Sequence, residues 1–288
     1  MGSIITLSIV QSALELGFIY ALVALALFIS FSILNIADLS TDGCFTLGCA
    51  VCASVTLAGH PVLGLLAAMA AGVCSGFVTA FLQTRLGIQS ILAGIIVNTG
   101  LYTINIAVMG FASNLNLFAC DSVFTWAKDA IGGTWDKLIV AAVIVALVGV
   151  LISLFLNTRL GLSIRATGDN PDMVRASSIN TGMMITIGLC VANALTGLSG
   201  GLLAQYQKSC DINLGPGMVT IALASLIIGE TIIGKGSMLK RVIGVILGSC
   251  LYRFIVAVAL RLNVPAECLK LVSSIIVAEA IAFPYLKK

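Results

Sequence analysis

The sequence predicts an all-α, polytopic membrane protein with about nine transmembrane helices. Of its 288 residues, 59% are hydrophobic and only 9% are charged, and the mean hydropathy is +1.13. A soluble domain carries about 25% charged residues, so lipid must solvate most of this chain. The 29 glycines and the scarcity of proline are typical of closely packed membrane helices. We interpret residues 1–288 as a single transmembrane domain.

Apolar stretches of span length follow one another along the chain, because about 20 apolar residues cross a bilayer as a helix. The second and seventh stretches are shorter than the others and begin with turn residues. The predicted spans are 12–34, 42–59, 62–84, 88–110, 137–157, 183–205, 217–234, 242–262 and 269–285.

The two short spans are predicted to be broken helices. Ser40, Thr41 and Asp42 are good N-caps for a helix that starts near Gly43. In the segment 213–217, Pro216 stands near the first helical position of the seventh span. A helix start inside the membrane is tolerated only where protein or a water-filled cavity satisfies its free N–H groups. Two ordinary connecting loops are the alternative.

The order of the spans indicates an inverted repeat. Four spans within 12–110 and four within 183–285 flank the single span 137–157. One intervening span inverts the second unit relative to the first, as in many transporters. Each unit has a turn-rich segment before its short span and an Arg-Leu pair before its last span. Chance similarity between apolar sequences is the alternative.

Lysine and arginine concentrate in alternate loops. The positive-inside rule therefore predicts a multi-pass protein with its N-terminus outside and its C-terminus in the cytoplasm. The largest outside loop is then 111–136, with Lys128. The inside loops hold Arg85, Arg159, Arg165, Arg175, Lys235, Lys240 and Arg241.

No catalytic or cofactor motif is recognisable. The segment 229–237 approaches a phosphate-binding loop, but Gly236 separates Lys235 from Ser237 and a membrane span precedes it instead of a strand. We therefore expect no ATP site, no metal site and no enzyme activity in this chain. Cys49 and Cys52 have the spacing of a metal site, but no second pair accompanies them, so they are interpreted as packing residues.

Polar residues inside the spans are candidates for a solute path. Asn98, Tyr102 and Asn105 lie at i, i+4 and i+7 and so share one face of the fourth span. Asn193 in the sixth span and Asp42 at the start of the second complete the candidate path. Hydrogen bonding and close packing between helices are the alternative.

Charged side chains also occur within or near the spans, where charge is costly and usually paired. Glu230, Arg253 and Glu279 are of this kind. We predict a structural ion pair between Arg253 and Glu279, and a substrate site is the alternative.

A polar, basic segment at 158–182 separates two apolar spans. Asp169 or Asn170 is expected to cap a short helix over about 171–178, with Pro171 in its first turn and Arg175 on its surface. A patterned loop of this length favours a docking surface. An ordinary basic inside loop is the alternative.

Two sequence patterns resemble a known family. Gly161-Leu-Ser-Ile-Arg-Ala-Thr-Gly-Asp-Asn170, followed by Ala176-Ser-Ser-Ile-Asn180, is similar to the cytoplasmic signature of bacterial ABC-importer permeases of the branched-chain amino acid/ribose permease family. Residues 33–48 resemble the beginning of that family's second span. The resemblance covers nearly the whole chain. Ser178 stands where the family usually has glycine, which puts the local helix geometry in question.

The resemblance implies a permease subunit of the bacterial cytoplasmic (inner) membrane. Two copies, expected to be a homodimer, would form the pore in the lipid bilayer. A separate ABC ATPase would bind ATP and Mg²⁺, an extracytoplasmic binding protein would deliver the solute, and nucleic acid is not expected as a partner.

The resemblance also implies a coupling helix within 158–182. Gly168 lies in the signature, Asp169 and Asn170 would set the start of the helix, and Met173 and Val174 would offer apolar contact to the ATPase. Arg165 and Arg175 would make polar contacts at its groove.

The expected solute is a small polar organic molecule, most simply an aromatic or branched-chain amino acid. A simple sugar or a nucleoside is the alternative within the same importer class. A secondary transporter, which would need acidic ion ligands at mid-membrane, is a more remote alternative, as is an intramembrane enzyme or channel.

Overall fold

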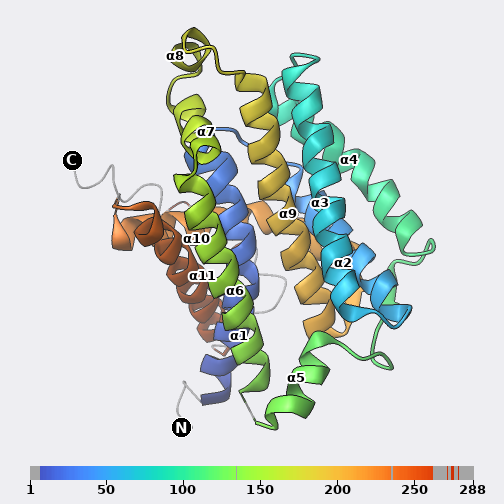
Figure 1. Cartoon of the computed structure of the whole chain (residues 1–288). Helices are drawn as coiled ribbons and strands as arrows, with labels where there is room; N and C mark the ends of the chain where they lie inside the picture. Colours follow the sequence, from blue (N-terminus) through green and yellow to red (C-terminus); the bar gives the residue numbers. More distant parts are fainter. Residues whose placement is uncertain are drawn as a thin grey trace.

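The computed structural model describes residues 7–133, 135–234 and 236–261, together with 271, 274, 275 and 278. Within these ranges the chain is a helical bundle in which α1, α3, α6 and α9 run roughly along one axis (Figure 1). The helices of the first half are α1 (Leu7–Leu27), its π-helical continuation η1 (Phe28–Ile33), α2 (Thr41–Leu57), α3 (Pro61–Thr84), α4 (Ser90–Val108), α5 (Val123–Ile131) and α6 (Asp136–Asn157). Those of the second half are α7 (Arg159–Asp169), α8 (Pro171–Ala176), α9 (Thr181–Gln207), the 3₁₀ turn η2 (Ile212–Leu214), α10 (Met218–Ile233) and α11 (Met238–Arg261).

Seven helical stretches among the described residues are long and apolar enough to cross a membrane. The prediction of about nine is therefore met only in part. The predicted second span is α2, whose 17 residues make it shorter than the other seven. The predicted ninth span, 269–285, lies outside the described residues, and the inverted repeat consequently stays a prediction. The seven are Leu7–Ile33, Pro61–Thr84, Ser90–Val108, Asp136–Asn157, Thr181–Gln207, Ile212–Ile233 and Met238–Arg261.

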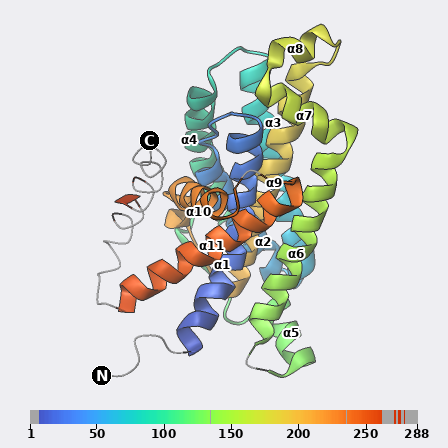
Figure 2. The ribbon, with the colours of Figure 1, turned by 90° about the vertical axis from the view of Figure 1, so that its left-hand side faces the viewer.

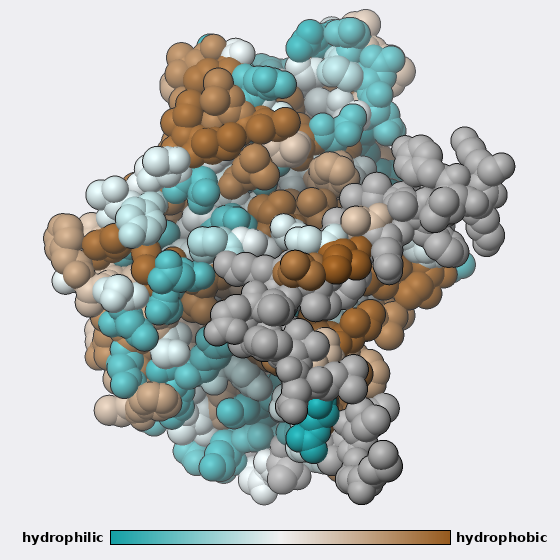
Figure 3. Space-filling view, turned by 180° about the vertical axis from the view of Figure 1, so that it is seen from behind, coloured by the Kyte–Doolittle hydropathy of each residue, from teal (hydrophilic) through white to brown (hydrophobic). Residues whose placement is uncertain are grey.

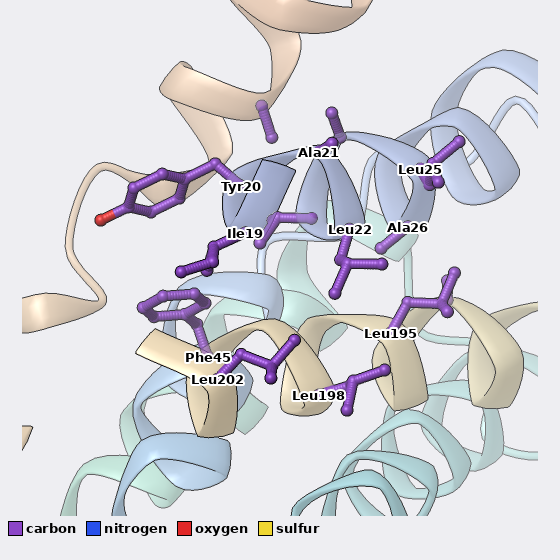
Figure 4. Packing of buried hydrophobic residues seen from close by; sticks show 14 of the residues in the cluster. Ile19, Tyr20, Ala21, Leu22, Leu25, Ala26, Phe45, Leu195, Leu198 and Leu202 are labelled. Carbon is purple, nitrogen blue, oxygen red and sulfur yellow. The ribbon is translucent and has the colours of Figure 1, made fainter. Parts of the chain in front are cut away.

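The core of the bundle lies where α1 and α9 meet. Ile19 and Leu22 of α1 pack with Leu198 and Leu202 of α9, and Phe45 of α2 closes one end of this cluster (Figure 4). These side chains are almost completely buried. Seen from behind, one hydrophobic patch lies exposed at the upper left and another toward the right, beside hydrophilic groups at the upper right and lower left (Figure 3). Exposed apolar residues of this kind are expected on a surface that lipid covers.

Glycines allow α2, α3 and α9 to approach one another at backbone distance. A Cβ built at Gly48 of α2 would collide with the carbonyl oxygen of Gly197 in α9. A Cβ built at Gly72 of α3 would collide with the carbonyl oxygen of Asn193. Small residues at such crossings let membrane helices gain close van der Waals contact, which fixes the positions of these three helices relative to one another.

The structure contains two features that the sequence analysis did not predict. The strands β1 (Asn114–Asn116) and β2 (Ser209–Asp211) pair antiparallel at the α5 end of the bundle, with Leu115 opposite Cys210. In Figure 2, α10 is viewed nearly along its axis whereas α6 and α9 run up the picture, so α10 crosses the bundle steeply. The turn formed by β2 and η2 delivers the start of α10 to the start of α2.

Candidate functional site

A cavity of about 270 Å³ lies beside the start of α2. It is lined by Asn98, Tyr102 and Asn105 of α4, as well as by Asp42 of α2. The predicted stripe on α4 is therefore confirmed as one face, and it faces the turn-rich start of α2. Ile212 and Pro216, which precede α10, complete the opposite wall.

The amides of the stripe point toward the backbone of α2. Asn105 is buried, and its Nδ2 donates a hydrogen bond to the carbonyl oxygen of Gly43 at 3.1 Å. Its Oδ1 has no hydrogen-bond partner within the described part of the chain. A Cβ at Gly43 would come within 2.6 Å of Asn98 Oδ1, so glycine makes room for that amide. Tyr102 is 55% exposed and stands at the mouth.

Asp42 joins the starts of two helices. Its Oδ2 accepts a hydrogen bond from the backbone N–H of Gly217 at 3.0 Å, and its Oδ1 accepts one from Val219 at 2.9 Å. The prediction that Asp42 caps its own helix is thus wrong, because its carboxylate caps α10. A carboxylate at a helix N-terminus satisfies free N–H groups and complements the helix dipole. Pro216 lies before the first turn of α10, since Gly217 is the N-cap, with φ 99°.

Asn193 lies away from this cavity and belongs to a buried cluster around Asp38. Asn193 Nδ2 donates to Asp38 Oδ2 at 2.8 Å. Asp38 Oδ1 accepts hydrogen bonds from the backbone N–H of Ser40 at 2.8 Å and from its hydroxyl at 2.6 Å. Thr79 of α3 donates to the Ser40 hydroxyl at 3.2 Å. Asn193 therefore does not line this cavity, and its place on a solute path stays a prediction.

Asp38 is the residue that the sequence reasoning missed. Ser40 is the N-cap residue of α2, but its side chain makes no capping hydrogen bond, and Asp38 orders the turn in its place. An acid two residues before a Ser-Thr pair is the signature of an Asx turn, and this signal was present in the sequence. The burial of Asp38 between α2, α3 and α9 could not be predicted from the sequence.

The segment 158–182 forms two short helices, α7 and α8, at one end of the bundle (Figure 1). The predicted cap is confirmed: Asn170 Oδ1 accepts hydrogen bonds from the N–H groups of Asp172 at 3.2 Å and Met173 at 3.1 Å. Helix α8 begins at Pro171 as expected and ends at Ala176. Asp169 is the last residue of α7 and does not cap α8.

The side chains of α8 divide between the bundle and solvent. Met173 is 55% exposed, whereas Val174 is 1% exposed in a helix that contacts α7 and α9. The expectation that Val174 offers an apolar surface to a partner is therefore wrong, because it anchors α8 to its own chain. Arg175 Nε donates to Thr181 Oγ1 at 3.2 Å, and its Nη1 lies 3.4 Å from Asp172 Oδ1, while most of its side chain is exposed. Arg165, on α7, is half-buried.

Nearly the whole chain matches one family of known proteins. Residues 9–278 match the family described as branched-chain amino acid transport system / permease component. The chain belongs to this permease family.

Three relatives indicate the breadth of the family. The permease is 34% identical over 272 residues to the tyrosine transport system permease protein of Clostridioides difficile (strain R20291), covering 94% of this chain and 90% of that protein. It is 32% identical over 224 residues to a D-allose transport system permease protein of Escherichia coli (strain K12), covering 72% and 63%. It is 26% identical over 226 residues to the ribose import permease protein of the same strain, covering 76% and 67%. No solved structure matches the chain significantly.

The permease is thus a membrane protein of an ABC transport system, and the members of its family are transport subunits rather than enzymes. The backbone conformation at Ser178 explains why the resemblance to the family led us to expect glycine there. Ser178 adopts φ 60°, a left-handed conformation that glycine takes at no steric cost. Serine keeps this backbone geometry, so the turn between α8 and α9 is formed despite the substitution.

Two charged residues within the described spans, Arg241 and Arg253, have partners that the sequence analysis did not name. Arg241 Nη2 of the permease lies 2.7 Å from Glu230 Oε1, and Ser32 donates to the same carboxylate oxygen at 2.7 Å. Arg241, which the sequence analysis placed in an inside loop, is half-buried in α11 and joins η1, α10 and α11. Arg253 lies over the ring of Tyr20, 3.7 Å from its centroid. Its predicted partner Glu279 lies outside the described residues.

Proposed function

We propose that this permease forms the membrane path of an ATP-driven importer for an amino acid, most specifically one with an aromatic side chain. The observation that carries the proposal is the polar cavity between α2 and α4. Similarity over nearly full length to a tyrosine transport permease supports the substrate class. In this proposal two copies form the pore, a separate ATPase binds α8, and an extracytoplasmic binding protein delivers the solute.

The chemistry of the cavity suits passage of a zwitterion. The Asp42 carboxylate already accepts two backbone hydrogen bonds from α10, so its charge is partly neutralised. The remaining polar side chains are neutral donors and acceptors, namely the amides of Asn98 and Asn105 and the hydroxyls of Tyr102, Thr46 and Thr99. A path must bind solute weakly enough to release it. At about 270 Å³ the cavity is also smaller than the ~300–1,000 Å³ of a typical ligand pocket, as expected for a narrow point of a path.

The double variant Asn98→Leu/Tyr102→Leu is expected to reduce tyrosine uptake about tenfold, because the solute loses two hydrogen-bonding groups that each contribute about 0.5–1.5 kcal/mol. Uptake of labelled tyrosine is measured in vesicles that contain the permease, its ATPase and its binding protein. Thr103→Leu is the matched control, since Thr103 is exposed on the same helix and does not line the cavity.

Unchanged uptake in the double variant would show that the stripe only packs the helices. Two competitors test the substrate class: ribose should not compete with tyrosine, and competition by ribose would favour the sugar alternative. Uptake that continues in the absence of ATP would contradict an ATP-driven importer and favour a secondary transporter.

We further propose that the α8 end faces the cytoplasm and that the α5 end, with the N-terminus, faces outward. The motivation is the concentration of basic residues in the loops at the α8 end. With native cysteines removed, a cysteine at position 128 on α5 should react with a membrane-impermeant maleimide added outside intact cells, and one at position 173 should not. Labelling of position 128 only after the cells are opened would reverse the orientation.

A further inference from the structure

A second cavity, of about 690 Å³, lies between α3 and α9 and plays no part in the proposed path. One wall runs from Phe77 to Arg85 at the end of α3, and the other runs from Asn180 to Thr186 at the start of α9. The two helices lie side by side, and α8 lies next to this end of α9 (Figure 1). This cavity is therefore at a boundary between the apolar bundle and the polar segment 158–182.

The end of the cavity nearest α8 is electropositive. Arg85 is exposed, and it makes no ion pair with any residue that the structure describes. The opposite wall is the N-terminus of the 27-residue helix α9. Asn180 accepts hydrogen bonds from Met183 and Met184, which leaves the N–H groups of Thr181 and Gly182 without an acceptor in the described chain. Free N–H groups at a helix start and a guanidinium together favour a phosphate.

The other end of the cavity is apolar and open. Phe77 and Phe81 lie one helical turn apart, with ring centroids 6.4 Å from each other. Both rings and the side chain of Met183 are exposed. The cavity therefore combines an electropositive end with an apolar groove that runs along the helices. A free phosphate would contact only the electropositive end, whereas a phospholipid would contact both.

We propose that this cavity binds one anionic phospholipid. Its phosphate is held by Arg85 and by the N–H group of Gly182, and one acyl chain lies along Phe77 and Phe81. The site goes beyond the proposed transport function and does not depend on the identity of the solute.

The position of the site gives the lipid a structural consequence. Arg175 of α8 donates to Thr181 Oγ1 at 3.2 Å, and the next residue, Gly182, lines the cavity. A lipid headgroup at Gly182 therefore holds the α8–α9 junction to the end of α3. Removing the lipid is expected to loosen this junction before it affects the core of the bundle.

The test measures lipid retention and thermal unfolding of the purified full-length permease. Native mass spectrometry of the unaltered protein should show co-purified dioleoylphosphatidylglycerol enriched at least about tenfold over dioleoylphosphatidylcholine offered at the same concentration, as expected for a charge-assisted phosphate contact. Added phosphatidylglycerol should raise the Tm, and inorganic phosphate alone should not. Because this arm uses no variant, it does not depend on the folding of any mutant.

Two variants then locate the site. Arg85→Gln should lose the preference for phosphatidylglycerol, whereas Arg159→Gln, which removes an exposed arginine of α7 that does not line the cavity, should keep it. Thr186→Trp, which fills the groove, should reduce retention of phosphatidylglycerol.

Three results would overturn the proposal. The first is equal retention of the two lipids by the unaltered permease, and the second is an undiminished preference in Arg85→Gln. The third is efficient cross-linking of a cysteine at position 81 to a second permease copy, which would assign the groove to a contact between copies. None of these readouts involves transport, so failure here leaves the proposed function standing.

Discussion

The double variant Met173→Asp/Arg175→Glu is expected to abolish ATP-driven uptake while leaving the membrane bundle folded. Both side chains are exposed on α8, where the proposed ATPase contact lies. The change replaces an apolar contact by a charge and reverses the charge of the arginine. The new carboxylate at position 175 also lies three residues from Asp172, where like charges repel on a helix. A helix of six residues has no stability of its own, so a partner and its neighbours must hold it.

Co-purification of the ATPase, its hydrolysis rate and solute uptake should be measured in one preparation. We expect loss of co-purification or hydrolysis without uptake, with at least about a tenfold fall in uptake for a loss of about 1.4 kcal/mol at the contact. Arg159→Glu makes the same charge reversal on α7 and should behave as wild type. Thr181→Val removes the internal acceptor of Arg175 without changing charge, which separates anchoring of α8 from docking. Wild-type values for all three measurements in the double variant would place the docking site elsewhere.

Asp38→Ala is expected to destabilise the folded bundle severely. Asp38 is 2% exposed and accepts hydrogen bonds from Ser40 N, Ser40 Oγ and Asn193 Nδ2. Alanine leaves these buried donors unsatisfied, and each such group costs about 1–3 kcal/mol. Summed over the cluster, the expected loss is about 3 kcal/mol or more. Thermal unfolding in detergent, followed by intrinsic fluorescence, measures it.

Two further substitutions give this prediction its reference points. Asp38→Asn keeps an acceptor for Ser40 but turns an amide donor toward Asn193 Nδ2, so an intermediate loss is expected. Asp129→Ala removes an exposed acid of α5 and should leave the Tm unchanged. An Asp38→Ala protein as stable as Asp129→Ala would show that the cluster contributes little to folding.

The positions of the long helices could be predicted from the sequence because lipid imposes a length and a composition on each span. The predicted span 62–84 and the observed helix Pro61–Thr84 agree closely for this reason. The capping of α8 was also predictable, since Asn170 and the N–H groups it binds are neighbours in the chain.

What could not be predicted depends on partners distant in sequence. The carboxylate of Asp42 binds the backbone of Gly217, 175 residues away, although its own helix offered an equally good local use. The same limit applies to Glu230, whose partners Arg241 and Ser32 come from two other helices. The pairing of β1 with β2 follows from the return of the chain after α9, and neither strand carries an alternating pattern long enough to be recognised.

The close packing of α7 on the end of the first helix restricts how this protein can change over generations. A Cβ built at Gly168 would overlap the main-chain carbonyl oxygen of Ile33. Crowding against a side chain can be relieved by a smaller residue at the opposing position. The peptide group of Ile33 is identical whichever residue stands there, so no second substitution makes room for a larger residue at 168. A substitution of Ile33 or Leu34 therefore leaves the requirement for glycine at 168 unchanged.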